Sequence, residues 1–299
     1  MNLEMEVKTE SKVKMSTFSK LKRRRKLIIS YTILSFLSLP LFLMYVWLFF
    51  SSISTDMIAG IIPTNITFEN WRFLWENVEI GSKQLPSIWK ATWNTFVLAS
   101  GLTVMEGIIS VMAGYALSRM EFPGRHFLLR SIILLHAFPS VALLIAVFYV
   151  LDTLGLIDTL WGVMLVKAAL QIPMSTYIIK GFFDDVPWDV EWSALIDGCN
   201  RINAWYQVVI PLVKPGIAAI SIFSFLAGWS EFLLLYAFIF DEKNVTLATY
   251  LQKIIGDFQM VDYGLLTAAG LFYMLPVIFF FIFTQKSLMQ MNMGGSKHV

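Results

Sequence analysis

Four ionisable side chains lie within long apolar stretches of this sequence. They are Glu106, His136, Lys167 and Glu231. A charge at the centre of a membrane costs at least about 2.5–3.5 kcal/mol on insertion scales, so each one needs a partner or a wet cavity. We expect Glu106 to bond a neighbouring helix, with Lys167 as a candidate partner. We expect His136 to hydrogen-bond at a helix kink rather than to act as a ligand.

The composition limits the other chemistry that is open to the chain. Of its 299 residues, 57% are hydrophobic and 15% are charged, whereas soluble domains carry about 25% charged residues. The sequence has no G-x-x-x-x-G-K-[ST] phosphate loop, a single cysteine and three scattered histidines. These features predict a membrane protein that binds no ATP by itself, holds no metal or cofactor and has no catalytic residue.

Six apolar segments are long enough to cross a bilayer as helices. They cover residues 27–54, 93–118, 127–151, 161–179, 215–240 and 263–284. Each reaches the roughly 17–25 residues that a spanning helix needs, and none shows the alternation of barrel strands. The sequence therefore predicts an all-α protein with six transmembrane helices, placed in the cell (inner) membrane.

The basic residues predict the orientation of these helices. If the N-terminus is inside, 17 of the 23 Lys and Arg residues lie on the cytoplasmic side and five lie outside. This bias follows the positive-inside rule and puts both termini in the cytoplasm. We divide the chain into a polar basic tail (1–26), expected to be a disordered arm, a transmembrane domain (27–285) and a C-terminal cytoplasmic tail (286–299).

The cytoplasmic loop at residues 180–214 has the pattern of two short helices separated by a turn. Pro187 suits the start of the first helix, and Asp197-Gly198 is a strong turn dipeptide. Pro211 and Pro215 end the second piece before the next span. Apolar side chains in the first piece predict an amphipathic helix with a surface to offer to a partner.

This loop resembles the EAA loop of ABC-transporter permease subunits, in which Glu-Ala-Ala precedes an Asp-Gly turn and a distal Ile/Leu-Pro pair. The spacing from Asp197 to Pro211 is that of the family. Three further stretches resemble maltose-type carbohydrate permeases and extend the resemblance to roughly residues 30–290. They are Tyr115-Ala116-Leu117-Ser118-Arg119 with Phe122-Pro123-Gly124-Arg125, Gly155-Leu156-Ile157-Asp158-Thr159, and Trp229-Ser230-Glu231-Phe232.

The sequence departs from the family pattern at three positions. Trp192 stands where the family has the motif glutamate, and Ser193 stands where it has the next alanine. Glu191 is acidic but lies one residue out of register. Ser230 replaces the asparagine of the fifth-span motif. The Asp-Gly turn and the distal proline are intact, so we expect the loop architecture to be kept.

The resemblance implies a membrane subunit that is not itself an enzyme: the second six-span permease of an ATP-driven, binding-protein-dependent sugar importer. Its partners would be a second, related permease, two ATPase subunits, an extracytoplasmic sugar-binding protein and the lipid bilayer, with no nucleic acid. The loop would hold a coupling helix that docks into an ATPase subunit. The coupling-loop residues so implied are Glu191, Trp192, Ser193, Ala194, Leu195, Ile196, Asp197, Gly198 and Pro211.

The candidate pathway residues are Glu231, Trp229 and Ser230. A carboxylate accepts hydrogen bonds from sugar hydroxyls, and an indole face can stack on a sugar ring. Trp229 and Glu231 are two residues apart, about 200° around a helix, so they cannot both line one narrow stripe. We expect Glu231 to face a polar cavity. The alternative is a structural bond from Glu231 to a neighbouring helix, and Ser230 is open to either role.

Other functions stay open at this point. The same machinery could import a glycerol phosphate or another polyol. An ion-driven secondary transporter would favour an inverted repeat and paired broken helices, and neither is visible in the sequence. A membrane scaffold without a pathway is a third alternative, against which the intramembrane charges argue weakly.

Overall fold

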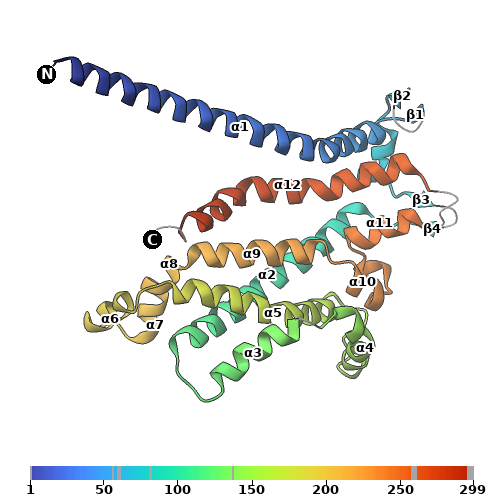
Figure 1. The fold of residues 1–299 in the computed structure, drawn as a ribbon. Helices are drawn as coiled ribbons and strands as arrows, with labels where there is room; N and C mark the ends of the chain where they lie inside the picture. The colour runs from blue at the N-terminus through green and yellow to red at the C-terminus, as the bar shows by residue number, and fades with distance from the viewer. Residues whose placement is uncertain are drawn as a thin grey trace.

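The computed structural model describes residues 2–55, 57–58, 62–80, 83–136, 138–256 and 261–294. Helices form most of this chain (Figure 1). The helices that build the bundle are α1 (Asn2–Ser52), α2 (Ile88–Arg119), α3 (Arg125–His136), α4 (Leu144–Thr153), α5 (Leu160–Asp184), α9 (Lys214–Trp229), α10 (Leu233–Phe238) and α12 (Tyr263–Gly294).

Shorter elements connect the long helices. They are the helices α6 (Trp188–Ile196), α7 (Arg201–Ala204), α8 (Ile210–Leu212) and α11 (Leu247–Ile255), the 3-10 turns η1 (Glu69–Leu74), η2 (Ser140–Leu143) and η4 (Glu242–Asn244), and the π-helical turn η3 (Trp205–Val209). Two small antiparallel ribbons pair β1 (Met57–Ile58) with β2 (Ile62–Pro63) and β3 (Glu79–Ile80) with β4 (Lys83–Gln84). The predicted all-α class is confirmed, with these ribbons as additions.

Four helical stretches in the described chain are long and apolar enough to cross a membrane. They are Arg24–Ser52, Ile88–Arg119, Leu160–Asp184 and Tyr263–Ile282. The number rises to six if each of two bent pairs is one span. One pair joins α3 to Ser140–Thr153 at 95°, and the other joins Arg201–Leu212 to α9 at 74°.

The expectation of one uninterrupted helix over residues 215–240 is wrong. Helix α9 ends at Trp229, and residues 230–232 separate it from the six-residue helix α10. A 16-residue helix rises only about 24 Å, which is short of the roughly 30 Å of a hydrocarbon core. The broken end of this segment therefore places irregular backbone within the bundle, where neighbouring helices must satisfy it.

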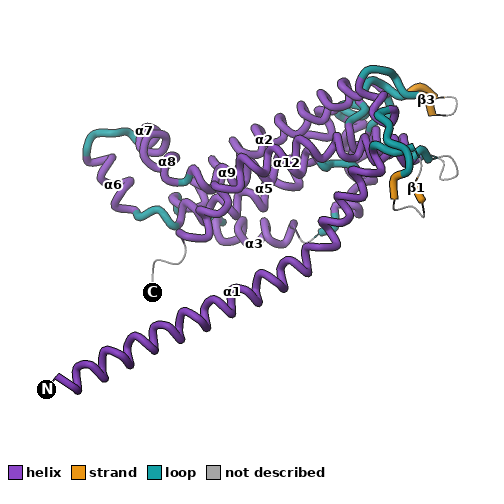
Figure 2. Tube along the Cα trace, turned by 90° about the horizontal axis from the view of Figure 1, so that it is seen from above, coloured by secondary structure: helices purple, strands orange, loops and turns teal. Residues whose placement is uncertain are grey.

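Helix α1 begins earlier than expected. It runs from Asn2, so the prediction of a disordered arm before residue 27 is wrong. The physical reason is that no glycine or proline occurs before Pro40, so nothing in this stretch breaks a helix. The N-terminal half of α1 extends away from the other helices (Figure 2). Side chains 24–45 are exposed, as expected for a segment that bilayer or partner subunits cover.

Helices α2, α5 and α9 form the centre of the bundle, with α2 packed against both of the others (Figure 1). A close backbone approach fixes the α2–α9 contact, because a Cβ on Gly228 would lie 2.8 Å from the Cα of Ala99. Small residues at such crossings let membrane helices pack tightly. This core is the frame that positions the candidate site.

One end of the bundle is closed by η1, α11 and the ribbons (Figure 1). Phe73, Ile88 and Tyr250 are buried in one apolar cluster there, and burial raises the pKa of the Tyr250 phenol to about 12, so that it stays neutral. Asp158, in the loop between α4 and α5, accepts backbone hydrogen bonds from Phe240 (2.8 Å) and Asp241 (2.9 Å). These bonds tie two loops together at this end.

The opposite end carries the loop that the sequence singled out. Helices α6, α7 and α8 lie there, at the same end as the start of α1 and the end of α12 (Figure 1).

Candidate functional site

The loop around α6 folds as helix, turn and helix, as its sequence predicts. Helix α6 follows Pro187, and Gly198 has a φ of +92°, a conformation that favours glycine. The amide of Gly198 donates to Leu195 O at 3.2 Å and that of Cys199 donates to Ala194 O at 3.0 Å, which satisfies carbonyls at the helix end. The Asn200 side chain then accepts from the Asn203 amide and caps α7.

Helix α6 presents large apolar side chains on one face. Trp188, Trp192 and Ile196 recur every four residues, which places them on one side of a helix. They are 45%, 57% and 85% exposed, and the two tryptophan rings lie 6.2 Å apart. We call these three residues the α6 stripe. Within the described part of the chain the stripe is exposed, apart from the face of Trp188 that packs on the Arg119 guanidinium.

The other predicted loop residues divide between the two faces. Glu191 and Ala194 are buried. Ser193, Asp197, Gly198 and Pro211 are exposed and Leu195 is half-buried. The Ser193 hydroxyl donates to Asp189 O at 2.7 Å, so it is engaged within α6.

Glu191 faces the bundle and meets the end of α2. The Tyr115 hydroxyl donates to Glu191 Oε1 at 2.6 Å, and Arg119 Nε lies 3.4 Å from Glu191 Oε2. Arg119 also donates to Phe183 O at 2.9 Å and to Val186 O at 2.6 Å. The sequence analysis missed Tyr115 and Arg119 as partners of Glu191, because only the fold brings residues 72 or more positions apart together.

Glu106 is buried between three central helices. The hydroxyl of Ser224 on α9 donates to Glu106 Oε2 at 2.7 Å, and the hydroxyl of Ser175 on α5 donates to Glu106 Oε1. The predicted bond to a neighbouring helix is confirmed, but the suggested partner Lys167 is wrong. Serine hydroxyls on both flanking helices satisfy the carboxylate.

Lys167 instead pairs with Glu231 at the break in the fifth segment. Their Nζ and Oε2 atoms are 2.5 Å apart. Glu231 Oε1 also accepts from the Leu234 amide at 2.9 Å and so caps the start of α10. Both oxygens of this buried carboxylate are bonded within the chain.

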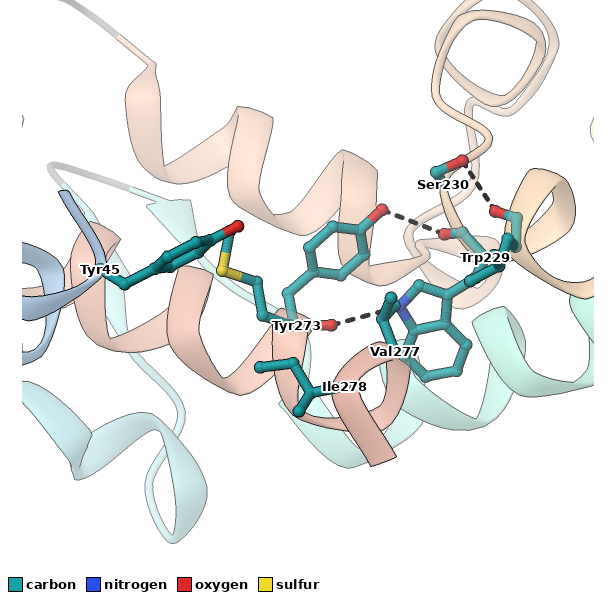
Figure 3. A pocket seen from close by; sticks show the side chains of 8 residues that line it. Tyr45, Trp229, Ser230, Tyr273, Val277 and Ile278 are labelled. Carbon is teal, nitrogen blue, oxygen red and sulfur yellow. Dashed lines mark hydrogen bonds between the residues drawn. The ribbon is translucent and has the colours of Figure 1, made fainter. Parts of the chain in front are cut away.

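A pocket of about 500 Å³ lies beside the break, between α1, α9 and α12 (Figure 3). Its lining residues are Tyr45, Leu226, Trp229, Ser230, Tyr273, Met274, Val277 and Ile278. The Trp229 indole donates to Tyr273 O at 3.2 Å, and the Tyr273 hydroxyl donates to Trp229 O at 3.1 Å. The Ser230 hydroxyl, directly after the end of α9, donates to Leu226 O in the last turn of that helix at 2.8 Å.

We expected Glu231, rather than Trp229, to face a cavity, and at this pocket the opposite is found. Trp229 and Ser230 line it, whereas Glu231 does not. The expectation assumed one continuous helix and a carboxylate in need of water. The break changes the direction of the chain after Trp229, and the ammonium group of Lys167 satisfies the charge.

His136 lies apart from the pocket residues, at the end of α3. His136 is exposed and is the last residue of α3, at the bend before η2. Within the described ranges, no group of three or more His, Cys, Asp or Glu side chains is placed to hold a metal ion.

The fold and the site define a class: a multi-span membrane protein with a helix–turn–helix loop at one end and a polar break inside its bundle. The chain matches the family described as "Binding-protein-dependent transport system inner membrane component" over residues 107–289. It therefore belongs to this family of transport-system membrane components. That membership decides against an ion-driven secondary transporter and against a scaffold.

Curated relatives share about three residues in ten with the chain. It is 31% identical to the diacetylchitobiose uptake system permease protein NgcG of Streptomyces coelicolor, with 89% of this chain and 87% of NgcG covered. It is 29% identical to the trehalose transport system permease protein SugB of Mycobacterium tuberculosis, with 81% and 87% covered.

A solved structure supports the fold. It is the crystal structure of a bacterial ABC transporter involved in the import of the acidic polysaccharide alginate, with a TM-score of 0.75 and 23% identity. The similarity covers 88% of this chain and 96% of the other. The chain thus has the fold of an ABC-importer permease.

Proposed function

We propose that this chain is one of two membrane-spanning subunits of an ATP-driven sugar importer, and that α6 couples it to an ATPase subunit. The observation that carries the proposal is the α6 stripe. Three large apolar side chains are held outward on a helix whose other face is fixed to the bundle through Glu191 and Ala194. An exposed apolar face on a rigid support is what a partner cleft would recognise.

The substrate class follows from the relatives. Those named above are permeases for diacetylchitobiose and trehalose, and another similar protein is the galactooligosaccharide permease GanQ of Bacillus subtilis. We therefore assign a di- or oligosaccharide as the cargo. A glycerol phosphate or another polyol, carried by the same machinery, is the alternative.

The partners and the orientation complete the proposal. ATP hydrolysis belongs to two partner ATPase subunits, a second, related permease forms the other half of the pathway, and an extracytoplasmic binding protein delivers the sugar. The α6 end, both termini and the tails 1–26 and 286–299 are cytoplasmic. This orientation places 17 of 23 basic residues inside.

The pathway is assigned to the region of the break after α9. Tyr273 offers an aromatic ring and Ser230 a hydroxyl on the pocket, while Trp229 lines it from a stack between Phe225 and Tyr273. An aromatic ring beside a hydroxyl suits a sugar with its apolar faces and polar rim. Glu231 supports this site indirectly, because its bonds to Lys167 and Leu234 hold the break that presents Ser230.

A deletion strain tests the function and the substrate class together. Uptake of labelled di- and oligosaccharides and of glycerol phosphate is measured with and without the gene for this chain. Loss of uptake of one saccharide, restored by the wild-type gene on a plasmid, is the expected result. Loss of glycerol phosphate uptake alone would support the alternative cargo, and unchanged uptake of the whole panel would contradict the proposal.

A further inference from the structure

A buried cluster joins α6 to the end of α2. The side chains of Arg119 and Glu191 are 3% and 6% exposed, although both are charged. Tyr115 and Arg119 lie one turn apart on α2: the Tyr115 hydroxyl donates to Glu191 Oε1, and the Arg119 guanidinium forms an ion pair with Glu191 Oε2 at 3.4 Å without a hydrogen bond. Two residues of α2 therefore contact the carboxylate of one residue of α6.

Arg119 makes further contacts that widen this connection. Its Nη2 atom donates to the carbonyls of Phe183, at the end of α5, and of Val186, between α5 and α6. Its guanidinium carbon lies 4.5 Å from the centre of the Trp188 ring. A single side chain therefore touches α5, the α5–α6 connection and two turns of α6.

Such a cluster resists sliding more than an apolar contact does. A buried ion pair is stable only while its geometry and hydrogen bonds are kept, because separating the charges leaves them without water or partners. Apolar side chains can repack against new neighbours at a smaller cost. We expect α6 and α2 to keep their relative position when a force acts on α6.

Helix α2 is itself bonded to the rest of the bundle core. Thirteen residues before Arg119, Glu106 accepts hydrogen bonds from Ser175 on α5 and Ser224 on α9. A displacement of α2 would therefore reach α9, the helix that ends at the pocket. Helix α2 thus carries two separate groups of polar contacts, one to α6 at Arg119 and one to α5 and α9 at Glu106.

We propose that Glu191, Arg119 and Tyr115 form a transmission cluster that makes α6 and α2 move as one rigid body during the transport cycle. The proposal rests on the proposed docking of an ATPase subunit at the α6 stripe. The three residues are positioning residues: Tyr115 and Glu191 bond each other on the bundle side of α6, and Arg119 packs on the ring of Trp188 in the α6 stripe. Through these contacts, a displacement of α6 by the ATPase subunit would also displace α2 and the helices packed against it.

The first experiment separates coupling from assembly. Glu191→Gln keeps the size of the side chain and removes its charge. In the intact complex we expect normal co-purification of the ATPase subunits and normal basal ATP hydrolysis. Stimulation of hydrolysis by the sugar-loaded binding protein should fall about tenfold, within the usual range of coupling between sites. Asp185→Asn, the same change at an exposed carboxylate beyond α5, should leave stimulation unchanged.

A milder variant keeps the test valid if Glu191→Gln fails to fold. Tyr115→Phe removes one hydroxyl donor and leaves the ion pair in place. We expect stimulation to fall about threefold to fivefold, as for the loss of one buried hydrogen bond. Normal stimulation in both variants would overturn the proposal, and so would a parallel loss of co-purification and stimulation, which indicates a merely structural role.

The second experiment measures the rigid body directly. Cys199 is the single cysteine of the chain and follows the turn after α6. Met112 on α2 is exposed, so Met112→Cys provides a second site for a spin label. The distance between the labels should be the same in the nucleotide-free and ATP-trapped complexes, and it should change between these states when Glu191→Gln is added. A change without that substitution would overturn the proposal.

The two proposals can fail separately. If Trp192→Ala leaves both ATPase association and stimulation intact, docking at the α6 stripe is wrong, while the label distances still decide whether α6 and α2 form one body. If Trp192→Ala weakens association but Glu191→Gln leaves stimulation normal, docking stands and the transmission cluster is wrong.

Discussion

Two buried carboxylates in the bundle are satisfied in different ways. Glu106 accepts from serine hydroxyls on two helices, whereas Glu231 is paired with Lys167 and caps α10. The first arrangement joins helices, and the second holds an interruption of a helix in place. Intramembrane charge in this protein is therefore explained by local bonding, and Trp229 and Ser230, not Glu231, line the pocket beside the break.

The Lys167–Glu231 pair gives a prediction about stability. Glu231→Leu or Lys167→Met alone leaves an unpaired charge in the bundle, and breaking a buried pair in this way costs about 3–5 kcal/mol. The double variant removes both charges, so we expect it to be more stable than either single variant. Thermal unfolding of the purified complex measures the three. A double variant whose loss equals the sum of the two single losses would contradict the ion pair.

Trp192 gives a prediction about subunit association. It is the central residue of the α6 stripe, and burying a large apolar side chain at an interface is worth about 2 kcal/mol, or roughly thirtyfold in affinity. We expect Trp192→Ala to weaken co-purification of the ATPase subunits by that order. Trp75→Ala, which truncates an equally exposed tryptophan in the segment between α1 and α2, is the matched control. Unchanged association in Trp192→Ala would show that this side chain faces another environment.

Two interruptions matter at the level of the elements. The turn at Gly198 ends α6 and aims it, and the break at residues 230–232 ends α9 beside the pocket. The first depends on a glycine at positive φ. The second depends on side-chain bonds from Glu231, in a stretch that stays apolar on both sides.

These two interruptions show what the sequence could predict. Pro187 and Asp197-Gly198 are local signals, so the loop was predicted with its turn in the right place. The break at residues 230–232 has no proline, and its two polar residues, Ser230 and Glu231, lie between apolar stretches, so the periodicity gave no sign of a break. The pairing of Lys167 with Glu231, and of Glu191 with Arg119, depends on the packing of distant segments.

A pair of glycines tests the turn. Gly198 and Gly124 have φ values of +92° and +89°, and a Cβ at either one would meet open space. Alanine at such a φ costs about 1–2 kcal/mol of backbone strain. We therefore expect Gly198→Ala and Gly124→Ala to lower the thermal stability of the complex similarly. Only Gly198→Ala should also lower sugar-stimulated ATP hydrolysis, and equal hydrolysis in the two variants would argue against a special role of the α6 turn.

At the level of the whole molecule, the account depends on which end faces the cytoplasm. Helices α6 to α8 lie at the same end as the start of α1 (Figure 1), and the basic residues 24–26 lie near the middle of α1. The opposite end is closed by η1, α11 and the ribbons. By the positive-inside rule, the end with α6 would face the cytoplasm and the ATPase subunits, and the end with α11 would face the side from which the substrate enters.

Cysteine labelling tests this orientation, first at the native Cys199 and then at introduced sites. A membrane-impermeant maleimide should leave the native Cys199 unlabelled in intact cells and label it in inside-out vesicles. In a Cys199→Ser background, a cysteine at the exposed Asn77, or at Asn244, should react from outside, whereas one at Ser296 should not. Ser296 itself lies outside the described residues. Labelling of Cys199 in sealed cells would reverse the assignment.

The central claim is that α6, aimed by the turn at Gly198, couples this permease to ATP hydrolysis. The most direct measurement is ATP hydrolysis by the intact complex carrying Gly198→Pro, with and without the sugar-loaded binding protein. Proline cannot adopt a φ of +92° and lacks the amide that donates to Leu195 O, so the turn cannot form. We predict that the subunits still assemble and that stimulation by the binding protein is lost. Normal stimulation in an assembled Gly198→Pro complex would contradict the account.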